Sequence, residues 1–192
     1  MPRKRTISDD ALLDAALVIV RASGPDALTF AALAPRAGLA GSTIVQRFGT
    51  KAALLQAALS RAWDLLDEAT ATAIDNAAPE PLGVIDMLVD LSGQYDPQDY
   101  ADQLLLLRED LRNPVLRARG RAWLATLTEA IDQRLDQATG GAAGLGELVV
   151  AQWQGTLTVW GFARSAPLES AVRTALEVLF DRLGFDEVGV RH

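Results

Sequence analysis

Apolar residues recur along this chain at intervals of three and four positions, which is the spacing of one face of an α-helix. The first such stripe consists of Leu12, Ala15, Ala16 and Ile19. Ser8 precedes it as a candidate N-cap, and Gly24 with Pro25 ends it. Strands would instead show alternation with β-branched residues, and no such stretch is found. The pattern therefore predicts an all-α fold.

Glycine and proline divide the rest of the sequence into further helices. A second helix begins after the cap Thr29 and ends at Gly38. A short third helix covers about residues 41–47, and a long fourth one runs from Thr50 to about residue 76. Five more are expected at about residues 81–93, 97–111, 114–138, 146–164 and 167–183. The chain is thus expected to contain about nine helices.

The second and third helices, joined by a tight turn at Gly38, form a candidate helix-turn-helix. This pattern alone is a weak signal, because any helical bundle contains short helices joined at a glycine. Leu28 and Leu33 flank the cap Thr29 with the spacing of a hydrophobic staple, which fixes how the chain enters the second helix. The core of this small domain is expected to contain Leu33, Ile44, Phe48 and Leu54.

The residues around this pair of helices resemble the tetracycline-repressor (TetR) family. The resemblance lies in Ala15-Ala16, Gly24, the run from Leu28 to Leu39 with Ala37-Gly38-Leu39, the run from Ser42 to Lys51 with Phe48-Gly49-Thr50-Lys51, and Leu54-Leu55. It covers residues 7–57, and the remainder agrees with the family only in length and helix count. The resemblance implies a helix-turn-helix DNA-binding domain at residues 1–55 and a larger helical ligand-binding and dimerisation domain at residues 56–192.

The function implied by the resemblance is that of a ligand-responsive transcriptional regulator, expected to be a repressor. Such a protein binds palindromic double-stranded operator DNA as a homodimer and is released by a small-molecule effector, and no cofactor is expected. Three positions depart from the family pattern: Val45 replaces an aromatic residue, Ala40 replaces a polar helix cap, and Pro35 lies inside the second helix. They leave open the alternative of a helical adaptor or sensor that has lost specific DNA binding.

Residues for base contacts are expected at the start of the third helix, because the N-terminal turn of the second helix of a helix-turn-helix enters the major groove. The candidates are Ser42, Thr43 and Gln46. Glutamine can bond adenine through both of its amide atoms, although Gln46 can equally hold a phosphate.

Residues for phosphate contacts are basic or lie at helix N-termini, where anions are favoured. The candidates are Thr29, Arg47, Lys51 and a basic arm formed by Arg3, Lys4 and Arg5. For Thr29 the alternative is a simple helix cap. For the arm the alternative is a solvated terminus.

The distribution of charge agrees with a polyanionic partner for the N-terminal part. Residues 1–51 carry seven basic and four acidic side chains, a balance of +3, whereas the balance of residues 52–192 is −10. The chain has no cysteine and one histidine, His192, so neither a catalytic site nor a metal site is expected. No apolar run approaches the roughly 18 residues of a membrane span. Asp9 and Asp10 interrupt any signal peptide, so a cytoplasmic protein is expected.

Apolar residues of the C-terminal half predict its core and a subunit interface. The stripe of 114–138 is Leu116, Trp123, Leu124, Leu127, Ile131 and Leu135. The segment 146–164 is apolar on more than one side through Leu148, Val149, Val150, Trp153, Leu157, Val159, Trp160 and Phe162. Such a helix must be buried on two sides, and the family resemblance implies that the last two helices pair between subunits. The expected dimer interface comprises Trp153, Leu157, Trp160, Val172, Leu176 and Leu179.

An effector site is expected inside the helical bundle, as an apolar pocket with a few polar groups. The candidates are Trp63, Met87, Gln103, Leu107, Trp123 and Trp153. For each of them the alternative of an ordinary core residue stays open.

Overall fold

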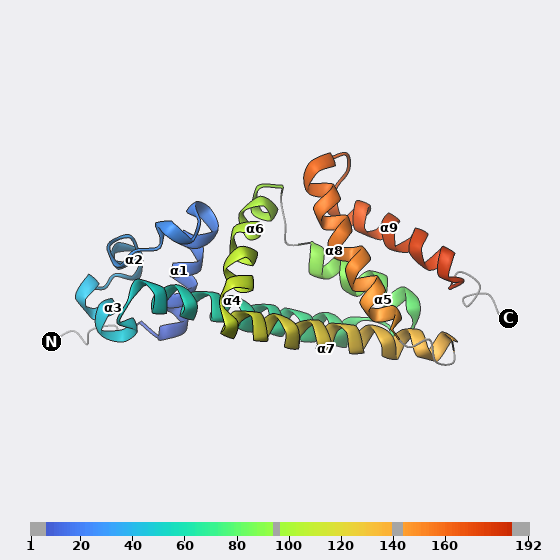
Figure 1. The fold of residues 1–192 in the computed structure, drawn as a ribbon, viewed down its shortest axis with the longest axis horizontal. Coiled ribbons are helices and arrows are strands. Elements are labelled where there is room, and N and C mark those ends of the chain that lie inside the picture. The colour runs from blue at the N-terminus through green and yellow to red at the C-terminus, as the bar shows by residue number, and fades with distance from the viewer. Residues whose placement is uncertain (1–6, 94–96, 140–143, 186–192) are drawn as a thin grey trace. The chain divides into compact units, whose positions relative to one another are not determined.

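The computed structural model describes residues 7–93, 97–139 and 144–185 (Figure 1), and within these ranges it contains nine α-helices and no β-strand. The helices are α1 (Asp9–Ser23), α2 (Phe30–Ala37), α3 (Gly41–Phe48), α4 (Lys51–Asn76), α5 (Pro81–Ser92), α6 (Pro97–Arg112), α7 (Pro114–Thr139), α8 (Leu145–Ala163) and α9 (Leu168–Leu183). The all-α fold is confirmed. A short 3-10 helix, η1 (Pro25–Ala27), was not expected, because three residues are too few to show a periodicity.

The N-terminal helices begin and end at the residues expected from capping rules. The Ser8 hydroxyl accepts a hydrogen bond of 3.2 Å from the Ala11 N–H at the start of α1. The Thr29 hydroxyl likewise accepts one of 3.0 Å from the Ala32 N–H at the start of α2. Gly38 ends α2 in the left-handed conformation with φ 64°, which a residue with a Cβ atom rarely adopts.

The chain divides into two compact units. The first unit comprises residues 1–66 and 101–120, and the second comprises residues 67–100 and 121–192. The core of the first unit is formed by α1, η1, α2, α3 and α4, with Leu12, Leu17, Val20, Leu28, Leu33, Ile44 and Leu54 at its centre. The expected boundary at residue 55 instead separates DNA binding from ligand binding and dimerisation. That division of function stays a prediction.

The core of the second unit is built around two tryptophans whose rings lie 6.3 Å apart, Trp123 of α7 and Trp153 of α8. Both indole N–H groups find acceptors inside the unit: Trp123 donates to the Thr70 hydroxyl at 2.8 Å and Trp153 to the Ser92 hydroxyl at 2.7 Å. A buried polar group without a partner would cost free energy, so these bonds allow the two indoles to occupy the core.

Four residues of the expected apolar stripes are exposed in the single chain. Leu124 of α7 is 41% exposed, and Leu148, Val159 and Phe162 of α8 are exposed as well. The other members of both stripes are buried. The sequence predicts α8 to be apolar on more than one side, and the described part of the chain covers one side of it.

Candidate nucleic-acid interface

Helices α2 and α3 are held as a rigid pair by a tight turn and a shared core. After the left-handed Gly38, the Leu39 N–H bonds back to the Ala34 carbonyl at 3.1 Å, which satisfies a carbonyl at the end of α2. Leu33 of α2 and Ile44 of α3 are completely buried. The orientation of α3 is therefore set by packing.

The two sides of α3 differ in burial and in chemistry. Ile44 is buried and Phe48 packs against the core, so this side faces inward. Ser42, Val45 and Gln46 are exposed on the opposite side, since positions three and four apart are neighbours on a helix. Neither Ser42 nor Gln46 forms a side-chain hydrogen bond with another described residue. The outward side of α3 thus presents a hydroxyl, an isopropyl group and an amide.

The N-terminus of α3 lacks a side-chain cap, as the alanine at this position predicted. Ala40 is extended, with φ −73° and ψ 142°, and no side chain accepts a hydrogen bond from the first turn. N–H groups at an uncapped helix start carry partial positive charge and favour an anion. The missing cap leaves these donors available to an external acceptor.

Pro35 lies inside α2 without breaking it. The helix continues to Ala37, and the Gly38 N–H bonds to both the Ala34 and the Pro35 carbonyls, which tightens the last turn. Pro35 itself is exposed. A proline this close to the helix end disturbs few intrahelical bonds, so α2 keeps its place.

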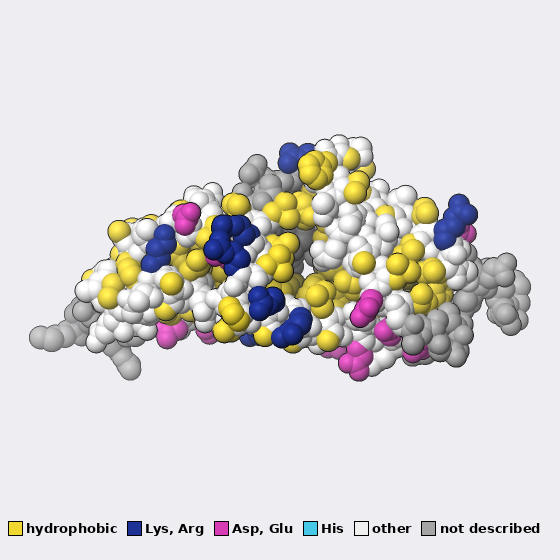
Figure 2. Space-filling view, in the orientation of Figure 1, with side chains coloured by type: hydrophobic (Ala, Val, Ile, Leu, Met, Phe, Trp, Pro, Cys, Tyr) yellow, Lys and Arg dark blue, Asp and Glu magenta, His cyan; other side chains and the backbone are white. Residues whose placement is uncertain are grey.

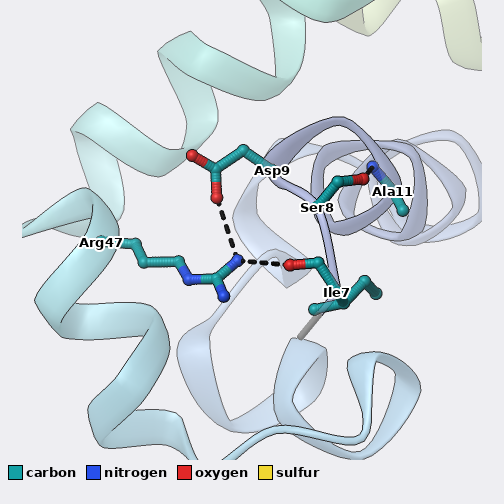
Figure 3. Close-up of polar contacts among 5 residues, drawn as sticks. All are labelled: Ile7, Ser8, Asp9, Ala11 and Arg47. Carbon is teal, nitrogen blue, oxygen red and sulfur yellow. Dashed lines mark hydrogen bonds and ion pairs between the residues drawn. The ribbon is translucent and has the colours of Figure 1, made fainter. Parts of the chain in front are cut away.

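Three expected phosphate contacts have partners within the chain. The Arg47 Nη1 donates to the Ile7 carbonyl at 3.0 Å and to the Asp9 carboxylate at 2.9 Å (Figure 3). The Lys51 Nζ donates to the Asp26 carbonyl at 2.7 Å. The Thr29 hydroxyl caps α2, so the helix-cap alternative holds for this residue. The partners of Arg47 and Lys51 lie 25 to 40 positions away in the sequence, so residue spacing does not reveal them.

Comparison with known families identifies this arrangement. Residues 12–58, which span α1 to the first turns of α4, match the family described as "Bacterial regulatory proteins, tetR family". This match places the segment 12–58 with the tetR family. No curated protein matches the chain.

Solved structures share the fold of this chain over nearly its whole length. A transcriptional regulator from Rhodococcus sp. Rha1 has a TM-score of 0.71 at 18% identity, over 91% of this chain and 97% of its own. The TetR-family regulator PfmR from Thermus thermophilus has a TM-score of 0.62 at 19% identity, over 88% and 97%. The multidrug-binding protein EbrR, complexed with proflavin, has a TM-score of 0.60 at 22% identity, over 88% and 96%. At these identities the likeness shows the fold.

Val45 departs from the tetR pattern, in which an aromatic residue stands at this position and can bond a phosphate. Valine cannot form that bond. In the structure it is 42% exposed and lies between Ser42 and Gln46 on the outward side of α3. An isopropyl group in this place suits an apolar contact such as that with the methyl group of thymine. The sequence pattern does not show that Val45 lies on the exposed side of α3, so this contact could not be predicted from it.

The remaining candidates for DNA contacts differ in how far the structure describes them. Thr43 is partly buried at the start of α3. Arg3, Lys4 and Arg5 lie outside the described residues. Of the helices that are described, none is long and apolar enough to cross a membrane. The described residues also contain no cluster of acidic or histidine side chains that could hold a metal ion.

The candidates for an effector site fall into both units of the chain. Met87, Trp123 and Trp153 are buried in the core of the second unit. In the first unit Leu107 is 49% exposed, and the Trp63 indole N–H donates to the Asp110 carboxylate at 3.1 Å. The side chain of Gln103 lies outside the described residues.

Most residues expected at the dimer interface are buried within the single chain, and their role in an interface stays a prediction. Five of the expected residues are core residues of the second unit, with side chains at most 6% exposed: Trp153, Leu157, Trp160, Val172 and Leu176. Leu179 is partly exposed. Side chains covered to this extent by their own chain have little surface left for a partner. The apolar residues that α8 leaves uncovered lie on its other side.

Proposed function

We propose that this protein is a transcriptional repressor that binds a palindromic DNA operator as a homodimer and is released by a small molecule. The observation that carries the proposal is the outward side of α3. Buried Ile44 holds the helix in place while Ser42 and Gln46 stay exposed without side-chain partners among the described residues. A short helix presented in this way fits the major groove, where side chains read base edges.

In this proposal the base contacts come from Ser42, Val45 and Gln46, with Thr43 beside them. Phosphate contacts come from the uncapped start of α3, from Lys51 and Thr29, and from the arm Arg3-Lys4-Arg5. Lys51 is exposed and donates to a backbone carbonyl, which carries no full charge and leaves that of the ammonium group unneutralised. A phosphate can therefore share this ammonium group.

The homodimer is supported by an apolar surface on α8, which we call the exposed α8 face. It consists of Leu148, Ala151, Gly155, Val159 and Phe162, all exposed and spaced by three and four positions. Phe162 is 89% exposed, and Figure 2 shows hydrophobic side chains at the surface over the C-terminal end of α8. Large apolar surfaces of this kind usually bind a partner, and in a two-fold dimer the same face covers itself.

A small-molecule effector is supported by the fold, since EbrR with a similar fold has been solved with proflavin. The candidates that we retain are Trp63 and Leu107 of the first unit and Gln103. Trp63 offers an aromatic surface beside the partly buried carboxylate of Asp110. Met87, Trp123 and Trp153 are assigned to the apolar core of the second unit.

Sequence selection by the purified protein tests the function. Fragments recovered from random DNA should contain an inverted repeat, and Gln46→Ala should lower affinity for it by about ten- to a hundredfold, because one bidentate base contact is lost. Gln154→Ala, which replaces an exposed glutamine of α8, is the matched control and should bind like wild type.

The alternative is a helical adaptor without specific DNA binding, which the departures from the tetR pattern at Ala40, Val45 and Pro35 leave open. If the wild-type protein binds selected and scrambled DNA equally well, the repressor proposal is wrong and the adaptor alternative takes its place.

A further inference from the structure

Arg47 connects the end of the reading helix with the start of the chain's first helix. It lies in the last turn of α3, and one guanidinium nitrogen bonds both the Ile7 carbonyl and the Asp9 carboxylate (Figure 3). These partners are 40 and 38 positions away in the sequence. The contact is therefore a tertiary link.

The link acts on the segment from which the basic arm leaves the domain. Asp9 is the first residue of α1, and Ser8 between the two acceptors caps this helix by bonding the Ala11 N–H. Residues 7–9 are thus held from α1 through the cap and from α3 through Arg47. Ile7 adjoins the segment that contains Arg3, Lys4 and Arg5.

Arg47 is poorly suited to a direct phosphate contact. Its side chain is only 22% exposed, whereas that of Asp9 is 68% exposed. The carboxylate at 2.9 Å already offsets the guanidinium charge, so a phosphate would gain less from this arginine than from an unpaired one. The neighbouring Asp10 is also exposed, but it forms no ion pair with any other described residue.

We propose that Arg47 is a positioning residue that holds the origin of the N-terminal arm against the reading helix. Through Ile7 and Asp9 it keeps the start of α1 and α3 in one arrangement, so that the arm leaves the domain from a fixed point beside the reading helix. The inference rests on the proposed DNA-binding function. It gives Arg47 a positioning role in place of the phosphate contact expected from the sequence. Since six residues span at most about 20 Å, the place where the arm begins decides which phosphates it can reach.

Replacing Asp9, the acidic partner, gives the sharpest test, because the two roles of Arg47 predict opposite changes in operator affinity. Asp9→Asn removes a negative charge near a polyanion and frees Arg47, so a phosphate contact would become stronger. A positioning role predicts the reverse, a loss of operator affinity of about three- to fivefold, the range of an exposed ion pair. Asp10→Asn is the matched control, because it removes the same charge one residue away and should leave affinity unchanged or raise it slightly.

A double-mutant cycle with the arm identifies the route of the effect. Arg47→Ala should weaken binding in the wild-type background and have no further effect once Arg3, Lys4 and Arg5 are all replaced by alanine. An equal loss in both backgrounds, or an Asp9→Asn variant that binds more tightly than Asp10→Asn, would overturn the inference.

Amide exchange without DNA supplies an independent readout. The Ala11 and Leu12 amides, which bond Ser8, should exchange faster in Asp9→Asn and Arg47→Ala than in Asp10→Asn. Equal exchange in all three variants would also contradict the link. Wild-type protein that binds no DNA overturns the proposed function and this inference together, whereas unchanged affinity in Asp9→Asn overturns this inference alone.

Discussion

The Trp63 indole nitrogen on α4 donates a 3.1 Å hydrogen bond to the Asp110 carboxylate on α6. Burial raises the pKa of this carboxyl above its ordinary 3.8; the Trp63 bond opposes the rise and the nearby Glu109 charge adds to it. The folded protein then holds a proton on Asp110 more tightly than the unfolded chain does. The stability contributed by this proton is fully present below pH 3.8 and is lost as the pH rises through the folded pKa.

Replacing this carboxyl should make the protein relatively more stable towards neutral pH. Asp110→Asn avoids burying a charge, because the introduced amide is neutral and its oxygen can still accept from Trp63. Denaturant unfolding from about pH 4 to about pH 7 should show the free energy of unfolding of the variant rising relative to wild type, up to a plateau above the folded pKa. A difference that is independent of pH, or that falls with pH, would contradict the prediction.

The exposed α8 face should determine the oligomeric state. Phe162→Glu puts a charge on the most exposed residue of the proposed interface and should convert dimers to monomers at micromolar concentration, with loss of operator binding. Sedimentation measures the mass and a binding assay the affinity. Gln154→Glu, at an exposed position on another side of α8, is the matched control and should remain dimeric. Dimers that persist in Phe162→Glu place the interface elsewhere.

Arg134 of α7 should be a main stabilising residue of the second unit. Its buried guanidinium donates to the Ile74 carbonyl near the end of α4 at 2.6 Å and to the Ala78 carbonyl beyond it at 3.1 Å. A further bond of 2.9 Å goes to Ala130 of its own helix. These carbonyls lose their partners in Arg134→Ala, which should lower the free energy of unfolding by about 3 kcal/mol.

The conservative variant separates hydrogen bonding from charge in this prediction. Arg134→Lys keeps the positive charge but cannot reach all of these acceptors, so its loss should be intermediate. Unfolding free energies of both variants close to wild type would show that the carbonyls are satisfied in another way.

Gly146 at the start of α8 should tolerate no side chain. A Cβ atom here would lie 2.6 Å from the Thr128 carbonyl oxygen of α7 and 2.9 Å from the Asp132 carboxylate, which accepts the Gly146 N–H at 2.7 Å. Gly146→Ala should therefore destabilise by about 1–3 kcal/mol, although alanine is the better helix former. The matched control is Gly155→Ala on the same helix, where an added Cβ meets no atom within 4 Å.

Both glycine variants should be measured in the Phe162→Glu background, so that subunit association does not contribute to the unfolding free energy. There the control should gain up to about 1 kcal/mol from helix propensity. A Gly146→Ala variant that is equally stabilised would contradict the close approach of α7 and α8.

Local rules were sufficient for the helices of this chain and for its DNA-binding segment. Ser8 and Thr29 cap helices because a hydroxyl before an apolar-periodic stretch can reach the free N–H groups of the first turn. Gly38 ends α2 because the turn needs a left-handed residue. Both signals depend only on residues within one or two turns, and they also carry the match to the tetR family.

Only the tertiary structure decided which side of each helix is covered and where each charge finds its partner. Trp160 and Val159 are equally apolar in a sequence pattern, yet Trp160 is 6% exposed and Val159 is 67% exposed, because the other helices of the second unit pack on one side of α8. Arg47 was expected on a phosphate, and the structure places it on Asp9, 38 positions away. Periodicity describes one helix at a time, whereas burial and ion pairing depend on which segments distant in the sequence are brought together when the chain folds.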